Sequence, residues 1–247
     1  MSIYALHVGL NKYPGGNALY KCVKDAMDLR QDMGFNGTLI VDKEGTQGNI
    51  VRAVNHTISQ AGPGDWVVIT YSGHGTQVRD RNGDEPDGWD EAMVDIKLRS
   101  LRDDLIYNSL IKLHKKARGW LISDSCFSGT QHRAVPLVGK AHLRKLRAEN
   151  IRYLPPSMVK AGRAVTNQGP QDALARWVFT SGCTDFEFSY EGENNGVLTG
   201  ALRKFYRSGI SFAKLHSEIN KEVEGWPQHP QLVCTANARR WLVPSMR

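Results

Sequence analysis

Apolar runs and helical patterns alternate along the first seventy residues, and this alternation constrains the fold more than any other feature. Runs at 3–10, 38–41 and 66–71 have the length and composition of buried strands. Between them, 19–33 and 46–61 carry apolar residues at helical spacing. A strand–helix–strand–helix–strand order of this kind predicts a doubly wound α/β fold with a mostly parallel sheet.

The rest of the chain predicts further elements of the same kind. The stretch 77–95 is acidic and lacks periodicity, so we expect it to be irregular. The other elements we expect are a helix at 100–116, strands at 120–122 and 177–180, helices at 196–206 and 212–223, and an edge strand at 231–235. No internal repeat or composition break divides the chain, which predicts a single domain over 1–247.

Composition excludes several classes of protein. Hydrophobic residues make up 40% and charged residues 23% of the 247 residues, which is typical of a globular enzyme or binding domain. No apolar run is long enough to span a membrane, and the N-terminus lacks the pattern of a signal peptide. The four cysteines are widely spaced without a C-x-x-C pair, so neither a zinc site nor a disulfide framework is indicated. A reducing, cytoplasmic location is therefore expected.

The net charge of +7 is concentrated in one segment. Residues 131–176, which we call the basic segment, hold nine Lys or Arg and two acidic residues, a net of +7. The segment is rich in proline and glycine and too long for an ordinary connection, so it is expected to be a functional or mobile insertion. It could contact an acidic partner, but it lacks interleaved aromatics and a helix-turn-helix pattern, which disfavours nucleic acid.

Two of the predicted strands end in small polar residues that carry chemistry. Tyr-Ser-Gly-His-Gly at 71–75 follows one apolar run, and Ser-Asp-Ser-Cys-Phe-Ser-Gly at 123–129 follows another. Ligands of parallel α/β sheets bind beyond the carboxyl ends of the strands. His74 and Cys126 are therefore candidates for an imidazole and a thiol nucleophile. Ser72 and Asp124 each lie two residues before them, a spacing that places side chains on the same side of an extended strand.

These stretches and several others resemble the metacaspases, which are caspase-like cysteine peptidases. The similarity extends to Val-Gly-Leu-Asn-Lys-Tyr at 8–13, Gly-Asp-Glu-Pro-Asp-Gly-Trp-Asp-Glu at 83–91, and Pro-Gln-Leu at 230–232. It covers nearly the whole chain and corresponds to a bare catalytic domain. Phe127 stands where metacaspases commonly have a histidine. The resemblance implies a caspase-like three-layer α/β/α sandwich.

The resemblance also implies the roles of the site residues. His74 and Cys126 correspond to the catalytic dyad, and the backbone N–H groups of Gly75 and Cys126 to the oxyanion hole. Metacaspases cleave after Arg or Lys. The residues that match their substrate-binding pocket are Cys22, Asp25, Ser72 and Asp124. Two carboxylates in a small cleft suit a guanidinium, which can pair with both.

Calcium is the cofactor that the resemblance implies, since many metacaspases need it. The matching acidic residues are Asp90, Asp103 and Asp104, and oxygen-rich clusters suit this ion. His132 and Arg133 fall where the family has a further acidic ligand. Two alternatives stay open: acidic surface without an ion, and an EF-hand-like loop that starts at Asp80. The second is weakened because Glu85 replaces the glycine that such a loop needs at position six.

The sequence therefore predicts a cysteine endopeptidase that cleaves protein or peptide substrates after Arg or Lys, without a membrane partner. Its basic segment offers nine basic positions next to the nucleophile, so we expect self-cleavage there, between Arg133 and Arg163. The alternative is a catalytically silent interaction module that binds partners through the basic segment. The intact His74 and Cys126 pair argues against that alternative.

Overall fold

A computed structural model describes residues 1–79, 89–125, 151–160, 171–184 and 187–245. The side chains of residues 89, 90, 103, 104, 171 and 172 also lie outside the described part. Within what is described, no helix is long and apolar enough to cross a bilayer.

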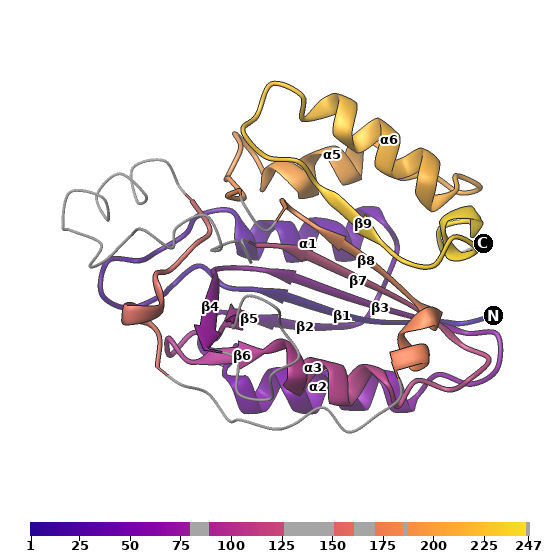
Figure 1. The fold of residues 1–247 in the computed structure, drawn as a ribbon, viewed down its shortest axis with the longest axis horizontal. Helices are drawn as coiled ribbons and strands as arrows, with labels where there is room; N and C mark the ends of the chain where they lie inside the picture. The colour runs from indigo at the N-terminus through magenta and orange to yellow at the C-terminus, as the bar shows by residue number, and fades with distance from the viewer. Residues whose placement is uncertain (80–88, 126–150, 161–170, 185–186, 246–247) are drawn as a thin grey trace.

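The centre of the fold is a six-stranded sheet in the order β2-β1-β3-β7-β8-β9 (Figure 1). All neighbours are parallel except β9, which lies antiparallel to β8 at the edge. The predicted mostly parallel sheet is confirmed. The strands are β1 (Ile3–Gly9), β2 (Thr38–Val41), β3 (Trp66–Ser72), β7 (Arg118–Asp124), β8 (Trp177–Ser181) and β9 (Gln231–Val233).

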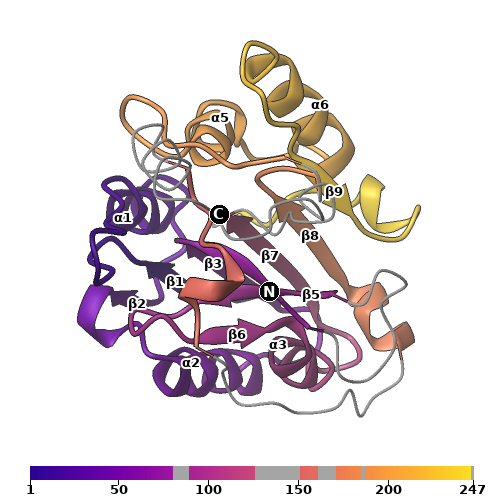
Figure 2. The ribbon, with the colours of Figure 1, turned by 60° about the vertical axis from the view of Figure 1, so that its left-hand side comes forward.

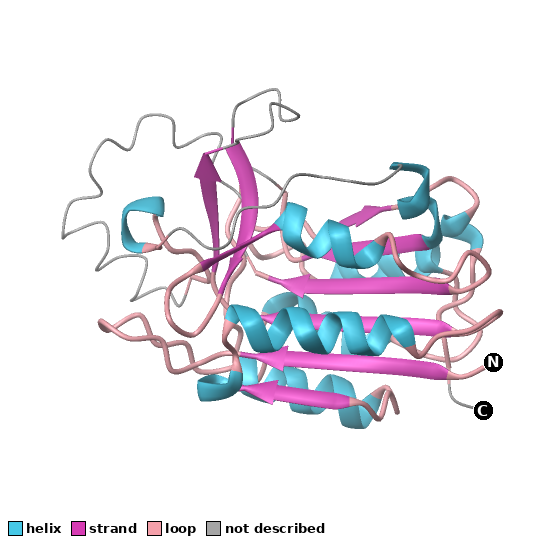
Figure 3. Ribbon diagram, turned by 90° about the horizontal axis from the view of Figure 1, so that it is seen from below, coloured by secondary structure: helices cyan, strands magenta, loops and turns pink. Residues whose placement is uncertain are grey.

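Helices cover both faces of the sheet and produce the expected three layers. On one face lie α1 (Cys22–Asp32), α5 (Val197–Phe205) and α6 (Phe212–Glu222). On the other lie α2 (Gln47–Ser59) and α3 (Asp103–Leu110), as Figure 3 shows from below. Short 3-10 turns complete the described elements: η1 (Asp42–Glu44), η3 (Pro156–Met158), η4 (Gln171–Arg176) and η5 (Ala238–Arg240).

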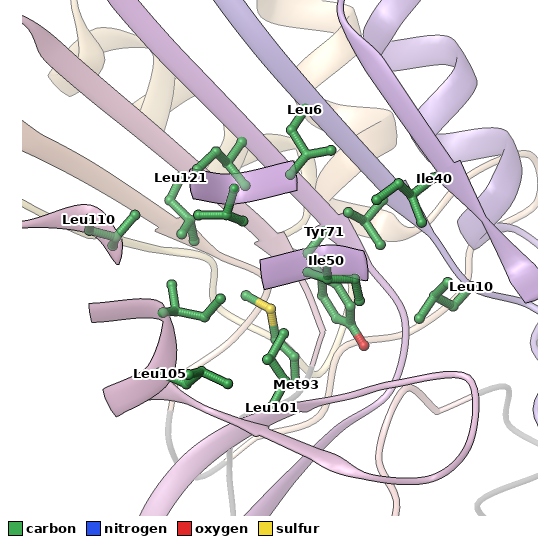
Figure 4. Packing of buried hydrophobic residues seen from close by; sticks show 14 of the residues in the cluster. Leu6, Leu10, Ile40, Ile50, Tyr71, Met93, Leu101, Leu105, Leu110 and Leu121 are labelled. Atoms are coloured by element: carbon green, nitrogen blue, oxygen red, sulfur yellow. The ribbon is translucent and has the colours of Figure 1, made fainter. Parts of the chain in front are cut away.

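Strand alternation sends side chains into two separate cores. In β3, Val67 and Ile69 belong to the core beneath the sheet, whereas Trp66 and Val68 belong to the core above it. A strand that is buried on both faces must be apolar throughout, which is why these strands read as continuous apolar runs. Figure 4 shows part of the lower core, between the sheet and the helices α2 and α3; its labelled residues include Leu6, Ile40, Ile50, Leu105 and Leu121.

A small antiparallel sheet was not predicted. It consists of β4 (Gly75–Arg79), β5 (Trp89–Val94) and β6 (Ser100–Arg102). The expectation that 77–95 is irregular is therefore wrong for its two ends, and the helix expected at 100–116 is shorter, because β6 occupies its first three positions. Leu101 of β6 is buried and pairs with Met93, so tertiary pairing overrides the helical pattern here.

The described parts of the basic segment pack against the domain. Residues 151–160 run past the end of the sheet (Figure 2) and beside β4 (Figure 1), where Tyr153 pairs with Gly75 and Lys160 with Arg99. Ile151, Arg152 and Leu154 are buried. This part of the segment is therefore an integral piece of the structure.

Candidate active site

Neighbouring strands β3 and β7 place two predicted site residues side by side. Ser72 and Asp124 are register partners at the carboxyl ends of these strands. Each continues the row of side chains that faces the upper core, because Val68 and Ile122 of the same rows lie there. Asp25 on α1 meets them from above: Ser72 Oγ donates to Asp25 Oδ2 at 2.7 Å.

Asp25 is fully buried and is held by donors from the segment that precedes α5. Its Oδ1 accepts from Asn195 Nδ2 and from the Gly196 N–H, both at 2.9 Å. Gly196 has no room for a side chain, because a Cβ there would lie 2.2 Å from Asp124 Oδ2. Donors that are already in place allow a carboxylate to remain charged in a buried site.

Asp124 is buried and bonded in the same way. Its Oδ2 accepts from the Thr199 N–H at 3.0 Å and from Thr199 Oγ1 at 2.7 Å. Its Oδ1 accepts from Ser189 Oγ at 2.8 Å. Asn195, Gly196, Ser189 and Thr199 thus bring donors to both carboxylates from the segment between β8 and α5 and from α5 itself, which are far from β3 and β7 in sequence.

A third carboxylate, Glu191, was not predicted. Its Oε1 accepts from the backbone N–H groups of Tyr20 (3.0 Å) and Lys21 (2.6 Å), directly before α1. An acidic group is favourable there because the start of a helix presents unpaired N–H groups and a positive dipole end. We call Asp25, Asp124 and Glu191 the carboxylate cluster. Cys22 Sγ lies 3.8 Å from Glu191 Oε1, and burial raises the pKa of this thiol, so Cys22 stays neutral.

The carboxylate cluster holds the guanidinium of the chain's own Arg152. Its Nη2 lies 2.6 Å from Asp25 Oδ2 and 3.7 Å from Glu191 Oε1, and its Nη1 lies 3.1 Å from Asp124 Oδ1. Nη1 also donates to Ser72 Oγ and to the Asp124 carbonyl, each at 2.8 Å. Arg152 is fully buried.

The charge state of Arg152 follows from two opposed effects. Burial by itself lowers the pKa of the guanidinium, but the charges of Asp124, Asp25 and Glu191 outweigh it and raise the pKa above its ordinary value. Arg152 therefore remains a cation. From the sequence it was counted as one of nine basic residues, although its apolar neighbours Ile151, Tyr153 and Leu154 are a local signal of burial.

His74 follows β3 and is fixed by the turn after β1. Its Nε2 lies 2.8 Å from the Asn17 carbonyl oxygen, and its ring packs 4.6 Å from the ring of Tyr13, centroid to centroid. A carbonyl can only accept, so Nε2 carries a proton, and in the neutral imidazole the lone pair is then on Nδ1. The His74 carbonyl accepts from Tyr71 Oη at 2.8 Å, which fixes the backbone as well. Neither Asn17 nor Tyr13 was predicted to support the histidine.

The predicted oxyanion-hole donor Gly75 already binds a peptide carbonyl. Its N–H donates to the carbonyl oxygen of Arg152 at 2.9 Å. Cys126 lies outside the described residues. The described chain reaches Ser125, whose Oγ lies 2.8 Å from Ser123 Oγ at the end of β7.

The predicted calcium ligands lie on two adjoining elements. Asp90 belongs to β5, and Asp103 and Asp104 are the first residues of α3. Ala92 of β5 pairs with Arg102 of β6. The backbone at Asp90 therefore lies near the backbone at Asp103 and Asp104. Their side chains are outside the described part, and among the described residues no three or more His, Cys, Asp or Glu side chains are placed so that they could hold a metal ion. Strands β4 and β5 come before and after the stretch that begins at Asp80, whereas an EF-hand needs flanking helices.

Comparison with known sequences identifies relatives along the whole chain. The caspase-domain family, Peptidase_C14, matches residues 2–241. Metacaspase-1B of Neosartorya fischeri is 26% identical over an alignment that covers 97% of this chain and 70% of that protein. Metacaspase-1 of Cryptococcus neoformans is also 26% identical, over 92% of this chain and 61% of that protein.

Two solved structures share the fold. Protein GSU0716 from Geobacter sulfurreducens superimposes with a TM-score of 0.73 at 24% identity, covering 98% of this chain and 97% of that one. Caspase-1 from Spodoptera frugiperda gives a TM-score of 0.59 at 10% identity, covering 94% and 86% of the two chains. The chain thus belongs to the caspase-domain family of cysteine-type endopeptidases, and its sequence relatives are metacaspases.

Proposed function

We propose that this protein is an Arg/Lys-directed endopeptidase that uses His74 and Cys126. The observation that carries the proposal is the buried guanidinium of Arg152 in the carboxylate cluster, with its own carbonyl oxygen bonded to the Gly75 N–H. An arginine residue of a substrate would place the same two groups on the same partners. Its scissile carbonyl would then lie next to His74, one residue before Gly75.

The chemistry follows from the residue types. His74 Nδ1 takes the proton of the Cys126 thiol, and the thiolate attacks the scissile carbonyl carbon. The C–N bond then breaks, the imidazolium donates its proton to the leaving amine, and the acyl group stays on sulfur as a thioester. Water adds to the thioester and releases the new carboxylate and the thiol. The Gly75 N–H stabilises the oxyanion in both steps, together with the Cys126 N–H.

Specificity for a basic residue follows from the charge of the cluster. Asp25 and Asp124 lie 2.6 and 3.1 Å from the guanidinium of Arg152, and Glu191 adds a third negative charge at 3.7 Å. The planar fork of arginine reaches Asp25 and Asp124 at once. The shorter reach and single ammonium of lysine would suit the same cluster less well. An acidic residue would be repelled by all three.

Calcium activation and self-processing complete the proposal. Asp90 on β5, and Asp103 and Asp104 at the start of α3, would supply the carboxylate oxygens that Ca²⁺ prefers. Self-cleavage is proposed within 131–176, because the basic segment reaches the site through Arg152. A cytoplasmic location suits the reaction, since the thiolate must stay reduced.

Reporter peptides with Arg, Lys or Asp before the scissile bond test the proposal, each with calcium and with a chelator. Cys126→Ala and His74→Asn should abolish turnover, and Cys234→Ala is the matched control, because Cys234 directly follows the edge strand β9 and packs against the upper core. Arginyl peptides should be cleaved fastest and aspartyl peptides not at all. Turnover that survives Cys126→Ala would refute the dyad. A folded, pure parent without any turnover would favour the silent interaction module.

A further inference from the structure

We propose that residues 151–154 are an intramolecular peptide ligand of the active site, with Arg152 in the place of a substrate's basic residue. The bound segment competes with outside substrates, so the uncleaved protein is self-inhibited. The inference rests on the proposed function, because it takes the carboxylate cluster to be the specificity site.

The backbone of the segment is held on both sides, as an added strand would be. The Arg152 N–H donates to the Ser189 carbonyl at 3.0 Å, and the Arg152 carbonyl accepts from Gly75 at 2.9 Å. One residue on each side, Ile151 pairs antiparallel with Tyr190, and Tyr153 pairs with Gly75. An extended peptide that adds to exposed strand edges is a general mode of peptide recognition. The bond presented next to Gly75 is therefore Arg152–Tyr153.

The guanidinium fills the space that an outside arginine would need. Arg152 Nη1 would lie 2.5 Å from a Cβ on Gly196, so the walls of the site touch the side chain closely. This one guanidinium donates to Asp25 Oδ2 and to Ser72 Oγ, and it pairs with Asp124. A second cation has no place, and an outside substrate can bind only after Arg152 leaves.

Tethering makes this competition strong. A segment of the same chain binds as if it were present at roughly millimolar concentration, without any special contact. Here it also makes the charged and backbone hydrogen bonds described above. Removing the Arg152 side chain should thus increase the affinity of the site for an outside cation by at least about tenfold.

Binding of p-aminobenzamidine, a fluorescent amidinium compound, tests the inference without requiring turnover. The titration is done in the Cys126→Ala chain, which keeps the segment uncut. Cys126→Ala/Arg152→Gly should bind the probe at least about tenfold more tightly than Cys126→Ala alone. Adding Asp25→Asn to Cys126→Ala/Arg152→Gly should reverse this gain in affinity for the probe. Arg176→Gly, which removes an arginine from the same basic segment at a distance from the cluster, should leave the affinity unchanged.

Folding of the variant is checked in the same preparation. Arg152→Gly leaves buried carboxylates without their cation, so its melting temperature should fall and should rise again when benzamidine is added. Arg152→Lys keeps a charge with fewer hydrogen bonds and serves if the glycine variant does not fold. It should bind the probe more tightly than the parent, though less tightly than a glycine variant would.

The outcomes separate the inference from the proposed function. Equal probe affinity with and without Arg152, in a parent that cleaves arginyl peptides, would overturn the intramolecular ligand and leave the specificity in place. No probe binding in any folded variant, in a parent that does not cleave arginyl peptides, would overturn both. Tighter binding that depends on Arg152 removal and on Asp25 would support both.

Discussion

Replacement of Asp25 by asparagine tests the carboxylate cluster most directly. The change preserves size and removes one buried charge. In the folded protein, Asp25 accepts hydrogen bonds from four donors: Ser72 Oγ, Arg152 Nη2, Asn195 Nδ2 and the Gly196 N–H. The side-chain oxygen of an asparagine can accept from the donors on one side of this position. Its NH₂ group then faces the donors on the other side, and two donors cannot form a hydrogen bond with each other.

The size of the effect follows from the burial of the pair. Arg152 and Asp25 have no exposed side-chain surface, and removing one partner of such a pair costs about 3–5 kcal/mol. Applied to the free energy of unfolding, this lowers the melting temperature by about 6–20 °C in a chain of this length. Applied to binding of a substrate's arginine in the transition state, about 3 kcal/mol corresponds to a loss of roughly 150-fold in kcat/KM.

The assay measures two quantities for each variant: kcat/KM for arginyl and lysyl reporter peptides, and the melting temperature. Asp32→Asn is the matched control, because Asp32 lies on the same helix, is 40% exposed and pairs with Arg203 at the surface. A surface pair contributes about 0–1 kcal/mol, so this variant should resemble the parent in both measurements. In the parent, Asp25→Asn also weakens the binding of Arg152, so kcat/KM is compared in chains that carry Arg152→Gly. If Asp25→Asn in that background cleaved arginyl peptides within threefold of Arg152→Gly alone, the carboxylate cluster would not be the specificity site.

Three further outcomes are expected. Calcium at millimolar concentration should raise both activity and melting temperature, and Asp103→Asn should weaken both responses; identical curves in chelator would exclude the ion. Burial lowers the pKa of His7 from 6.5 to about 4, so the unfolded chain binds a proton that the folded chain does not. The free energy of unfolding should therefore fall by about 3 kcal/mol as pH drops from 6.5 to 4, and less in His7→Gln, as urea titrations at each pH would show. Gly196→Ala should cost about 1–3 kcal/mol by overpacking the carboxylate cluster, whereas Gly225→Ala, with open space around it, should be neutral in thermal denaturation.

The sequence by itself determined the layers of the fold. Strands buried on both faces must be apolar throughout, and helices that cover them must carry an apolar stripe, so both signals are local and readable. Helix ends were readable where a cap is local, as at Thr46, whose Oγ accepts from the Asn49 N–H at the start of α2. The strand ends before His74 and Cys126 were readable because glycine and small polar residues interrupt the apolar runs.

Tertiary structure alone decided what depends on pairing between distant segments. β6 is a strand rather than the first turn of a helix, because Leu101 pairs with Met93 and is buried. Glu191 belongs to the site only because the fold brings the segment before α5 to the start of α1.

Arg152 is the clearest case. Its apolar neighbours Ile151, Tyr153 and Leu154 indicate a buried stretch, but no local rule shows whether an arginine within such a stretch is buried or solvated. The difference arises from Asp25, Asp124 and Glu191, which are 127, 28 and 39 positions away along the chain. A charge can be buried only where opposite charges and donors are already assembled, and that assembly exists only after the layers have packed.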